Sequence, residues 1–400
     1  MSTPLETLGR PYFFAVEDSD HGDVPSPRLD QAHRTRVRSL SGMQKEALVT
    51  SSVSGTTWRL VSDEGDYLDG DDVAPPPLAF MTTGVVSSVT TELLALADQR
   101  GVEVDDVEVR VDNYYTMNGS ALRGTMTGGA LPIDVDVVLD ADTDEETVQE
   151  LVETAITLSP VSGLLQGTHE SVFTLTCNGK PVAPDRVDEL DSALLSDPNA
   201  AFETLAREAT RRDPPLMNRT DRTAEPPATA DQKYTSSEGS SLEEEQDRIL
   251  HLQGVCTLDD DGVKRIETRA FSPVGTVFEF RSDEPEGHGG HGRAPDAMTY
   301  VAAGLGLCFM TQLGRYADIV DTELTDYRIV QDTHASRGGA SAGTNESGRI
   351  APVETHVFLD TPAGEEFARE ALDMGEQTCF LHALSRTDLD EPAVTVSKSH

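Results

Sequence analysis

Residues 74–98 read APPPLAFMTTGVVSSVTTELLALAD, and residues 294–318 read APDAMTYVAAGLGLCFMTQLGRYAD. The two stretches lie 220 positions apart, align without a gap and share seven of 25 residues. In each, proline precedes an apolar run, which predicts a helix over about Leu78–Asp98 and again over Met298–Asp318. The chain therefore carries one folding unit twice.

The same offset holds on both sides of the predicted helix. Upstream, Ser52–Gly65 (SVSGTTWRLVSDEG) matches Ser272–Pro285 (SPVGTVFEFRSDEP) with six identities. Downstream, Pro132–Asp140 (PIDVDVVLD) matches Pro352–Asp360 (PVETHVFLD). Segments so far apart rarely keep one register by accident, so the duplication extends well beyond the helix.

Each copy predicts the same order of elements: strands, the apolar helix, two strands, a second helix and a last strand. Strands in runs with two segregated helices indicate an α+β fold. The predicted strands are Thr57–Val61, Val104–Asn113, Ile133–Asp140 and Val172–Thr176 in the first copy, and Val277–Arg281, Leu324–Gln331, Val353–Asp360 and Ala393–Ser397 in the second. The second helix is predicted to begin at Glu145 or Gly364 and to run past Ser159 or Cys379.

Composition along the chain predicts four regions. Residues 1–33 are expected to be loosely ordered, 34–181 form the first domain, 182–245 connect the copies, and 246–400 form the second domain. In the connection we expect a polar helix over Asp188–Arg212. A flexible linker is expected over Asp213–Ser241, which is rich in Pro, Ser, Thr and Ala.

Acidic residues dominate the charge. There are 71 Asp and Glu against 31 Lys and Arg, a formal net charge of −40. Such a charge repels phosphate and argues against nucleic acid as a partner. Its spread along the whole chain is typical of proteins from salt-accumulating halophiles, in which molar salt screens the repulsion. No apolar stretch predicts a membrane span and the N-terminus does not predict a signal peptide, so we expect a cytoplasmic protein without a membrane partner.

The chain has four cysteines, none in a C-x-x-C pair, so neither a disulfide scaffold nor a zinc site is expected. Cys308 and Cys379 lie 71 residues apart, and the repeat offset places Ser88 and Ser159 at the matching positions. Two matched Cys/Ser differences indicate one function lost or gained jointly. The alternative is that both thiols are inert buried residues.

These features resemble the OsmC/Ohr family of osmotically inducible and organic-hydroperoxide-resistance proteins. The resemblance rests on three features of the sequence. Two are the glycine-rich helix GLGLCFMTQLGRYAD around Cys308 and the second cysteine about 70 residues later. The third is LSPVSGLL at Leu158–Leu165, which is similar to the family's Cys-Pro-[Val/Tyr]-Ser segment. The resemblance covers roughly residues 35–180 and 246–400. It implies α+β domains that dimerise by intertwining, so a tandem chain would form an internal pseudo-dimer. Further homo-oligomerisation stays open.

The resemblance also implies thiol-based reduction of organic hydroperoxides without a cofactor or metal. Cys308 would be the peroxidatic thiol and Cys379 the resolving thiol, with a dithiol as reductant. Asp296 falls near the place of the family's glutamate, two residues further from the cysteine, and could equally be a helix N-terminal charge. The supporting cation would come from an early strand or loop; Arg36, Arg38 and Arg269 are the candidates. Phe380 stands where the family tends to have proline after the second cysteine.

A second hypothesis keeps the fold but not the catalysis. It is a stress-related protein that binds an apolar ligand, with incidental or redox-sensing cysteines. His288 and His291, in the glycine-rich segment Glu286–Arg293, predict a loop or lid rather than a metal site. Cys177 and Cys256 have no matched partners and are expected to be structural. The loop Ser336–Gly348 lacks the GK[ST] ending of a phosphate loop.

Overall fold

The two apolar segments form the long central helices α2 (Pro77–Arg100) and α6 (Ala297–Ile319), as predicted. The computed structural model describes residues 4–16, 23–203, 205, 214–228, 233–234 and 240–398. Proline at the first turn starts α2, because its missing N–H is not needed there. The Asp296 carboxylate caps α6 by accepting a hydrogen bond from the Thr299 N–H at 2.6 Å. By length and composition either helix could cross a membrane, but their apolar windows are 83% and 100% buried inside this protein.

Helices α2 and α6 pack against each other through matched glycines. A Cβ atom on Gly84 would lie 2.6 Å from Val301 Cγ2 and 2.8 Å from the Ala297 carbonyl oxygen. A Cβ on Gly304, the repeat counterpart of Gly84, would lie 3.0 Å from the Met81 nitrogen. Glycine therefore sets how closely the two central helices approach.

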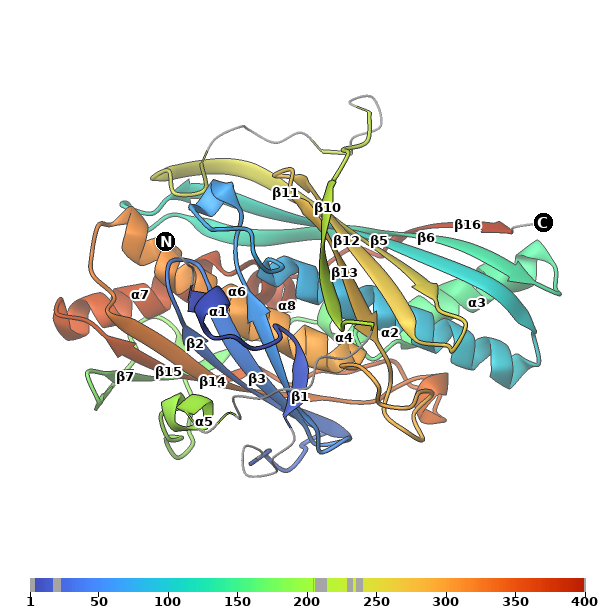
Figure 1. Cartoon of the computed structure of the whole chain (residues 1–400), viewed down its shortest axis with the longest axis horizontal. Helices are drawn as coiled ribbons and strands as arrows, with labels where there is room; N and C mark the ends of the chain where they lie inside the picture. The colour runs from blue at the N-terminus through green and yellow to red at the C-terminus, as the bar shows by residue number, and fades with distance from the viewer. Residues whose placement is uncertain are drawn as a thin grey trace.

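Two sheets enclose these helices (Figure 1). Helix α2 packs on the sheet that contains β11, β5 and β12, and α6 packs on the sheet that contains β2, β3 and β14. In strand order, the first sheet is β10 (Met217–Thr223), β13 (Thr276–Ser282), β12 (Lys264–Ser272), β11 (Glu245–Leu258), β5 (Val104–Ser120), β6 (Thr127–Ala141) and β16 (Ala393–Lys398). The second is β1 (Phe14–Val16), β4 (Thr57–Ser62), β3 (Lys45–Ser51), β2 (Gln31–Ser39), β14 (Asp326–Ala335), β15 (Glu354–Asp360), β7 (Val172–Cys177) and β8 (Lys180–Val182), with β9 (Asp188–Glu189) beside β7.

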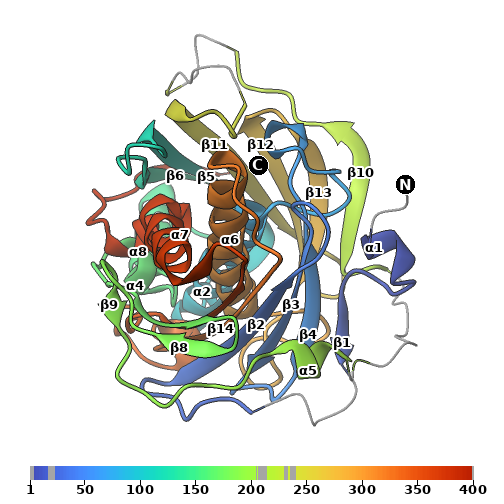
Figure 2. The ribbon, with the colours of Figure 1, turned by 90° about the vertical axis from the view of Figure 1, so that its left-hand side faces the viewer.

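Each sheet contains strands from both copies. Strand β11 of the second copy pairs antiparallel with β5 of the first, and β2 of the first pairs antiparallel with β14 of the second. The last strand of each copy adds in parallel to the other copy's strand, β7 to β15 and β16 to β6. In the end view of Figure 2, the central helices α2 and α6 lie between the two sheets. The α+β class and the intertwined internal pseudo-dimer are thereby confirmed.

The second helix of each copy ends just before Ser159 or Cys379 instead of continuing past that residue. Helix α3 (Glu145–Leu158) ends before Ser159, and α7 (Gly364–Thr378) ends before Cys379. Short helices follow, α4 (Ser162–Leu165) and α8 (Phe380–Arg386). Proline after Ser159 disfavours the helical conformation at that serine, and Cys379 adopts an extended conformation without a following proline. The expectation of a continuous helix was wrong at both places.

The regions outside the repeat are more structured than expected. Near the N-terminus, α1 (Pro4–Thr7) buries Leu5, and β1 pairs with β4. Within the expected linker, β10 pairs with β13. The polar helix expected over Asp188–Arg212 is replaced by β9 and the short α5 (Asn199–Glu203), and residues 204 and 206–213 lie outside the described residues.

Candidate active site

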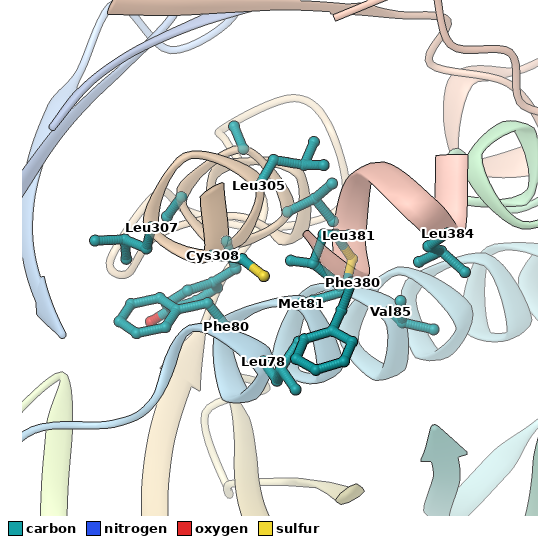
Figure 3. Packing of buried hydrophobic residues seen from close by; sticks show 14 of the residues in the cluster. Leu78, Phe80, Met81, Val85, Leu305, Leu307, Cys308, Phe380, Leu381 and Leu384 are labelled. Carbon is teal, nitrogen blue, oxygen red and sulfur yellow. The ribbon is translucent and has the colours of Figure 1, made fainter. Parts of the chain in front are cut away.

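Two free thiols meet at the centre of the second copy. Cys308 lies in the middle of α6, and Cys379 occupies the break between α7 and α8. Their sulfurs are 3.5 Å apart, and the two residues are 2% and 0% exposed. Figure 3 shows Cys308 directed from α6 toward the side where Phe380 and Leu381 of α8 lie. The sulfurs are in contact but not bonded, because a disulfide bond is about 2.05 Å long.

The serine counterparts form the same pair in the first copy. The hydroxyl oxygens of Ser88, in α2, and Ser159, after α3, are 2.8 Å apart and buried. The helix break that delivers Cys379 to Cys308 therefore also delivers Ser159 to Ser88. The repeat has kept the geometry and changed the chemistry, because a hydrogen-bonded hydroxyl pair cannot undergo the redox chemistry of a dithiol.

An apolar pocket adjoins Cys308. Both copies and the connecting segment contribute its lining, so the pocket exists only because the copies intertwine. Phe380, which stands where the family resemblance leads one to expect proline, forms part of the wall. The apolar lining comprises Leu68, Pro76, Pro77, Leu78, Met117, Leu250, Leu252, Ala270, Pro273 and Phe380.

Two buried ionisable residues of the first copy face the thiol of the second. Glu64 lines the pocket and accepts a hydrogen bond from the Tyr67 hydroxyl at 2.6 Å. Burial raises the pKa of Glu64 to about 7. Lys45, on β3, is fully buried and donates to the Met43 carbonyl oxygen at 2.7 Å. Burial lowers the pKa of Lys45 to about 8, although Glu64 and Cys308 lie near enough to oppose that shift electrostatically.

Two arginines of the second copy also line the pocket. Arg315 lies about two helical turns after Cys308 in α6 and donates from Nε to the Ser241 carbonyl oxygen at 2.7 Å. Arg248, on β11, hydrogen-bonds the Ser241 hydroxyl and the Ser240 carbonyl oxygen. Burial and the neighbouring Arg248 charge lower the pKa of Arg315 to about 10, so it stays cationic near neutrality. The pocket thus combines an apolar wall with positive charge.

The supporting residues expected from the sequence lie elsewhere. Arg36 reaches the Asp23 carbonyl oxygen, Arg38 pairs with Glu46, and Arg269 pairs with Glu267. In β2, the alternation of side chains explains the result for Arg36 and Arg38, because Thr35 and Val37 face α6 while the arginine that follows each of them faces away.

Asp296 caps α6 and lines the pocket beside Ser88 instead of the pocket beside Cys308. Twelve residues separate Asp296 from Cys308. Along a helix that spacing is about 18 Å, too far for the two side chains to share a site.

The sequence held a signal for the residues that were missed. Ser62-Asp63-Glu64 recurs as Ser282-Asp283-Glu284 at the repeat offset. Lys45 pairs with Ser62 across the strands, as Lys264 pairs with Ser282, so these lysines are also counterparts. They lie 219 residues apart, one fewer than the main offset, which concealed the match.

In the reduced pair, burial and the adjacent Cys379 thiol raise the pKa of Cys308 well above its ordinary value. The resting thiol is therefore protonated, and reaction requires a nearby base or an approaching substrate to remove the proton. Cys177 and Cys256 are buried elsewhere, and burial raises the pKa of each thiol. Among the described residues, no cluster of three or more His, Cys, Asp or Glu side chains could hold a metal ion.

A buried dithiol in a twofold-repeated, intertwined α+β fold defines the class of protein. Comparison with protein families matches the description "OsmC-like protein" at residues 69–173 and 289–390, just over half of the chain. The chain belongs to the OsmC-like family and carries two copies of its domain.

Among solved structures, the chain is similar to an OsmC-like hydroperoxide resistance protein from Jannaschia sp. CCS1. The two are 24% identical, with a TM-score of 0.20, over 32% of this chain and 81% of that one. No curated protein matches the chain.

Proposed function

We propose that the protein reduces organic hydroperoxides with the Cys308–Cys379 dithiol. The observation that carries the proposal is the 3.5 Å approach of two free sulfurs beside an apolar pocket. An alkyl hydroperoxide matches that pocket, since its chain is apolar and its reactive oxygens are polar. Membership of the OsmC-like family is in keeping with the thiol-based peroxide reduction that the sequence resemblance implies.

The chemistry balances in two steps. The Cys308 thiolate attacks the terminal peroxide oxygen, the O–O bond breaks, and the departing alkoxide takes a proton to become an alcohol. The resulting sulfenic acid condenses with the Cys379 thiol, which forms the disulfide and releases water. A dithiol reductant then exchanges with the disulfide, becomes oxidised itself and restores both thiols.

The charged residues around the pocket support this sequence. Lys45, which interacts electrostatically with Cys308, stabilises the negative charge of the thiolate, and Arg248 and Arg315 add positive charge to the pocket lining. Glu64, whose pKa of about 7 keeps part of it protonated near neutrality, donates the proton that the alkoxide takes. Because burial raises the Cys308 pKa, a higher pH favours the thiolate, whereas Glu64 loses the proton that it donates as the pH rises above about 7, so turnover should pass through a maximum with pH.

Peroxide consumption in the presence of a dithiol reductant tests the proposal. We expect Cys308→Ser to reduce the rate to that of the reductant alone. Cys379→Ser should still consume about one equivalent of cumene hydroperoxide and leave a sulfenic acid that dimedone labels at Cys308. Cys177→Ser, which removes a thiol far from the pocket, is the matched control and should turn over normally.

Equal rates for the wild type and Cys308→Ser would refute the proposal. They would favour the other hypothesis, an OsmC-like protein that holds an apolar ligand in the same pocket. Its lining of leucine, proline and phenylalanine suits such a ligand.

A further inference from the structure

A second pocket lies beside the Ser88–Ser159 pair, at the place that the repeat relates to the thiol pocket. Part of its framework is the same. Glu284 and Thr91 line it, as Glu64 and Thr311 line the thiol pocket. Lys264, the counterpart of Lys45, donates to Glu284 at 2.8 Å and also to the Thr91 hydroxyl. The second pocket is therefore a built site, although it has serines where the first has thiols.

Its wall is polar where the thiol pocket is apolar. At the repeat offset, Leu68 and Pro76 are replaced by His288 and Asp296, and Met117 is replaced by Arg337.

The strand register adds two further exchanges. Tyr115 and Ala335 are counterparts in the repeat. Leu250 lies opposite Tyr115 in one sheet and Gln31 lies opposite Ala335 in the other, so Gln31 takes the place of Leu250. By the same register Leu252 corresponds to His33. Four of these polar residues line one cavity, and the fifth, His33, lies beside the Asp296 carboxylate. Such a concerted change is not expected of a site that has merely decayed.

Within the described residues, two nitrogen atoms of these polar residues lack hydrogen-bond partners. Among the residues that the structure describes, the buried His288 Nδ1 makes no hydrogen bond, and neither does His33 Nε2. His33 is 1% exposed, and its Nε2 lies 3.8 Å from the Asp296 carboxylate, beyond hydrogen-bond distance. Unsatisfied buried polar atoms cost free energy, which a polar ligand would recover.

The charges indicate the kind of ligand. Glu284 is neutralised by Lys264. Burial opposes ionisation of Asp296, but His33 and the Thr299 N–H outweigh it and hold the Asp296 pKa below its ordinary value. The Arg337 side chain has no carboxylate within ion-pair distance in the described part of the chain. Both Arg337 and Asp296 act electrostatically on His288, so they lie near the same imidazole. The Arg337 cation remains available to a ligand, and so does the second carboxylate oxygen of Asp296, because the Thr299 N–H and the His33 ring both lie at Oδ1.

We propose that the second pocket binds a small zwitterion, an ammonium carboxylate of the size of a free amino acid. Its carboxylate pairs with Arg337 and its ammonium group with Asp296, while the imidazole of His288 and the hydroxyl of Ser88 supply hydrogen bonds. The site is independent of the dithiol.

The loop that follows β14 covers this ligand position. Ser341 lines the pocket, and the Glu92 carboxylate of α2 accepts the N–H groups of Ala340 and Ser341. A Cβ on Gly339 would overlap that carboxylate, at 2.2 Å from one oxygen, so glycine is required for the contact. The segment Ser336–Gly348, which lacks the signature of a phosphate loop, thus acts as the roof of the second pocket.

Isothermal titration calorimetry on the full chain tests the proposal with three probes: L-alanine, propionate and ethylammonium. L-Alanine should bind saturably at one site per chain, and propionate and ethylammonium, which each lack one charge, should bind at least tenfold more weakly. Absence of saturable L-alanine binding, or propionate binding as tight as L-alanine, would overturn the proposal.

Variants locate the binding. Arg337→Met installs the residue of the thiol pocket and should weaken L-alanine at least tenfold. Asp296→Asn, which retains a helix cap, should do the same. Arg337→Lys keeps the charge and should retain part of the affinity, which separates charge loss from misfolding.

The matched control Met117→Leu should not change L-alanine affinity. Unchanged affinity in Arg337→Met would refute the site. Hydroperoxide turnover of Arg337→Met should equal that of the wild type, so the two proposals fail separately.

Discussion

Glu64 and Lys45 place a carboxyl and an amine in one buried region beside Cys308. Burial raises the pKa of Glu64 to about 7 and lowers the pKa of Lys45 to about 8. Both shifts favour the uncharged forms, because desolvation disfavours charge. Both pKa values lie within about one unit of neutral pH, so each group can release or accept a proton there at little cost.

We predict that Glu64→Gln changes the pH dependence of stability. Because the folded state holds the Glu64 proton more tightly than the unfolded state, folded protein binds more protons between about pH 4.5 and 7, and stability falls as pH rises through that window. The variant lacks this loss, so its stability relative to wild type should increase by up to about 3 kcal/mol from pH 4.5 to 7.5. Urea denaturation at a series of pH values measures it.

Glu153→Gln, on the exposed side of α3, is the control for removal of one negative charge. A difference between Glu64→Gln and wild type that stays constant from pH 4.5 to 7.5 would show that Glu64 is not desolvated as the structure indicates.

At the level of elements, the crossing of α2 and α6 positions both sites. Gly84 and Gly304 let the helices approach closely, and one turn further along each helix lie Ser88 and Cys308. The break between α7 and α8 then brings Cys379 against α6. The distance between the Cys308 and Cys379 sulfurs thus depends on how the helices pack at Gly84 and Gly304, which take no part in the reaction.

Gly84→Ala should destabilise the protein, although alanine favours helix by about 1 kcal/mol. The new methyl group would overlap Val301 and the Ala297 carbonyl oxygen, and the helices would have to separate. We expect the free energy of unfolding to fall by about 1–3 kcal/mol in chemical denaturation. Gly306→Ala, in α6, is the matched control, since its methyl would meet only the side chains of Thr35, Val37 and Gln331, at 3.2 Å or more. A stability increase in Gly84→Ala would contradict the close crossing.

For the whole molecule, exchange of strands between the copies makes folding a property of the complete chain. Strand β11 has β5 of the other copy as a neighbour, and α6 packs on α2 and on strands β2 and β3 of the first copy. Neither half can satisfy its strand edges or cover its central helix alone.

Residues 240–400 expressed alone should therefore not fold as a monomer. The fragment should be either unfolded or a homodimer in which a second copy supplies the missing strands and carries two dithiols. Size-exclusion chromatography with light scattering, combined with circular dichroism, distinguishes these states. A monomeric fragment with a cooperative unfolding transition would refute the intertwined fold.

The net charge of −40 predicts that salt stabilises the folded chain. Screening at molar ionic strength shortens the reach of repulsion to about 3 Å. Relief of about 5 kcal/mol would raise the thermal midpoint by roughly 6 °C. We expect the midpoint to rise from 0.1 to 2 M KCl, and choline chloride at equal ionic strength to give a similar rise if screening is the cause. A midpoint that is flat or falls with salt would exclude a halophilic adaptation.

Local pattern and internal repetition were sufficient for much of this protein. The apolar helices, the α+β class, the duplication and the matched Cys308–Cys379 and Ser88–Ser159 positions could all be predicted, because each depends on residues that are neighbours or that recur at one offset. Pro160 marks the helix end at Ser159 in the sequence. The end at Cys379 could not be predicted, because the extended conformation of Cys379 depends on packing and no proline follows it.

Tertiary structure alone decided which residues surround each pair. Glu64 and Lys45 act on a thiol more than 240 positions away, because strands and loops of one copy cover the helix of the other. For the same reason Asp296 belongs to the serine pocket: about 18 Å of helix separates it from Cys308, and the intertwined partner brings Pro76 to the thiol instead. Sequence revealed the two pairs, whereas the crossing of the copies determined that one pocket is apolar and the other polar.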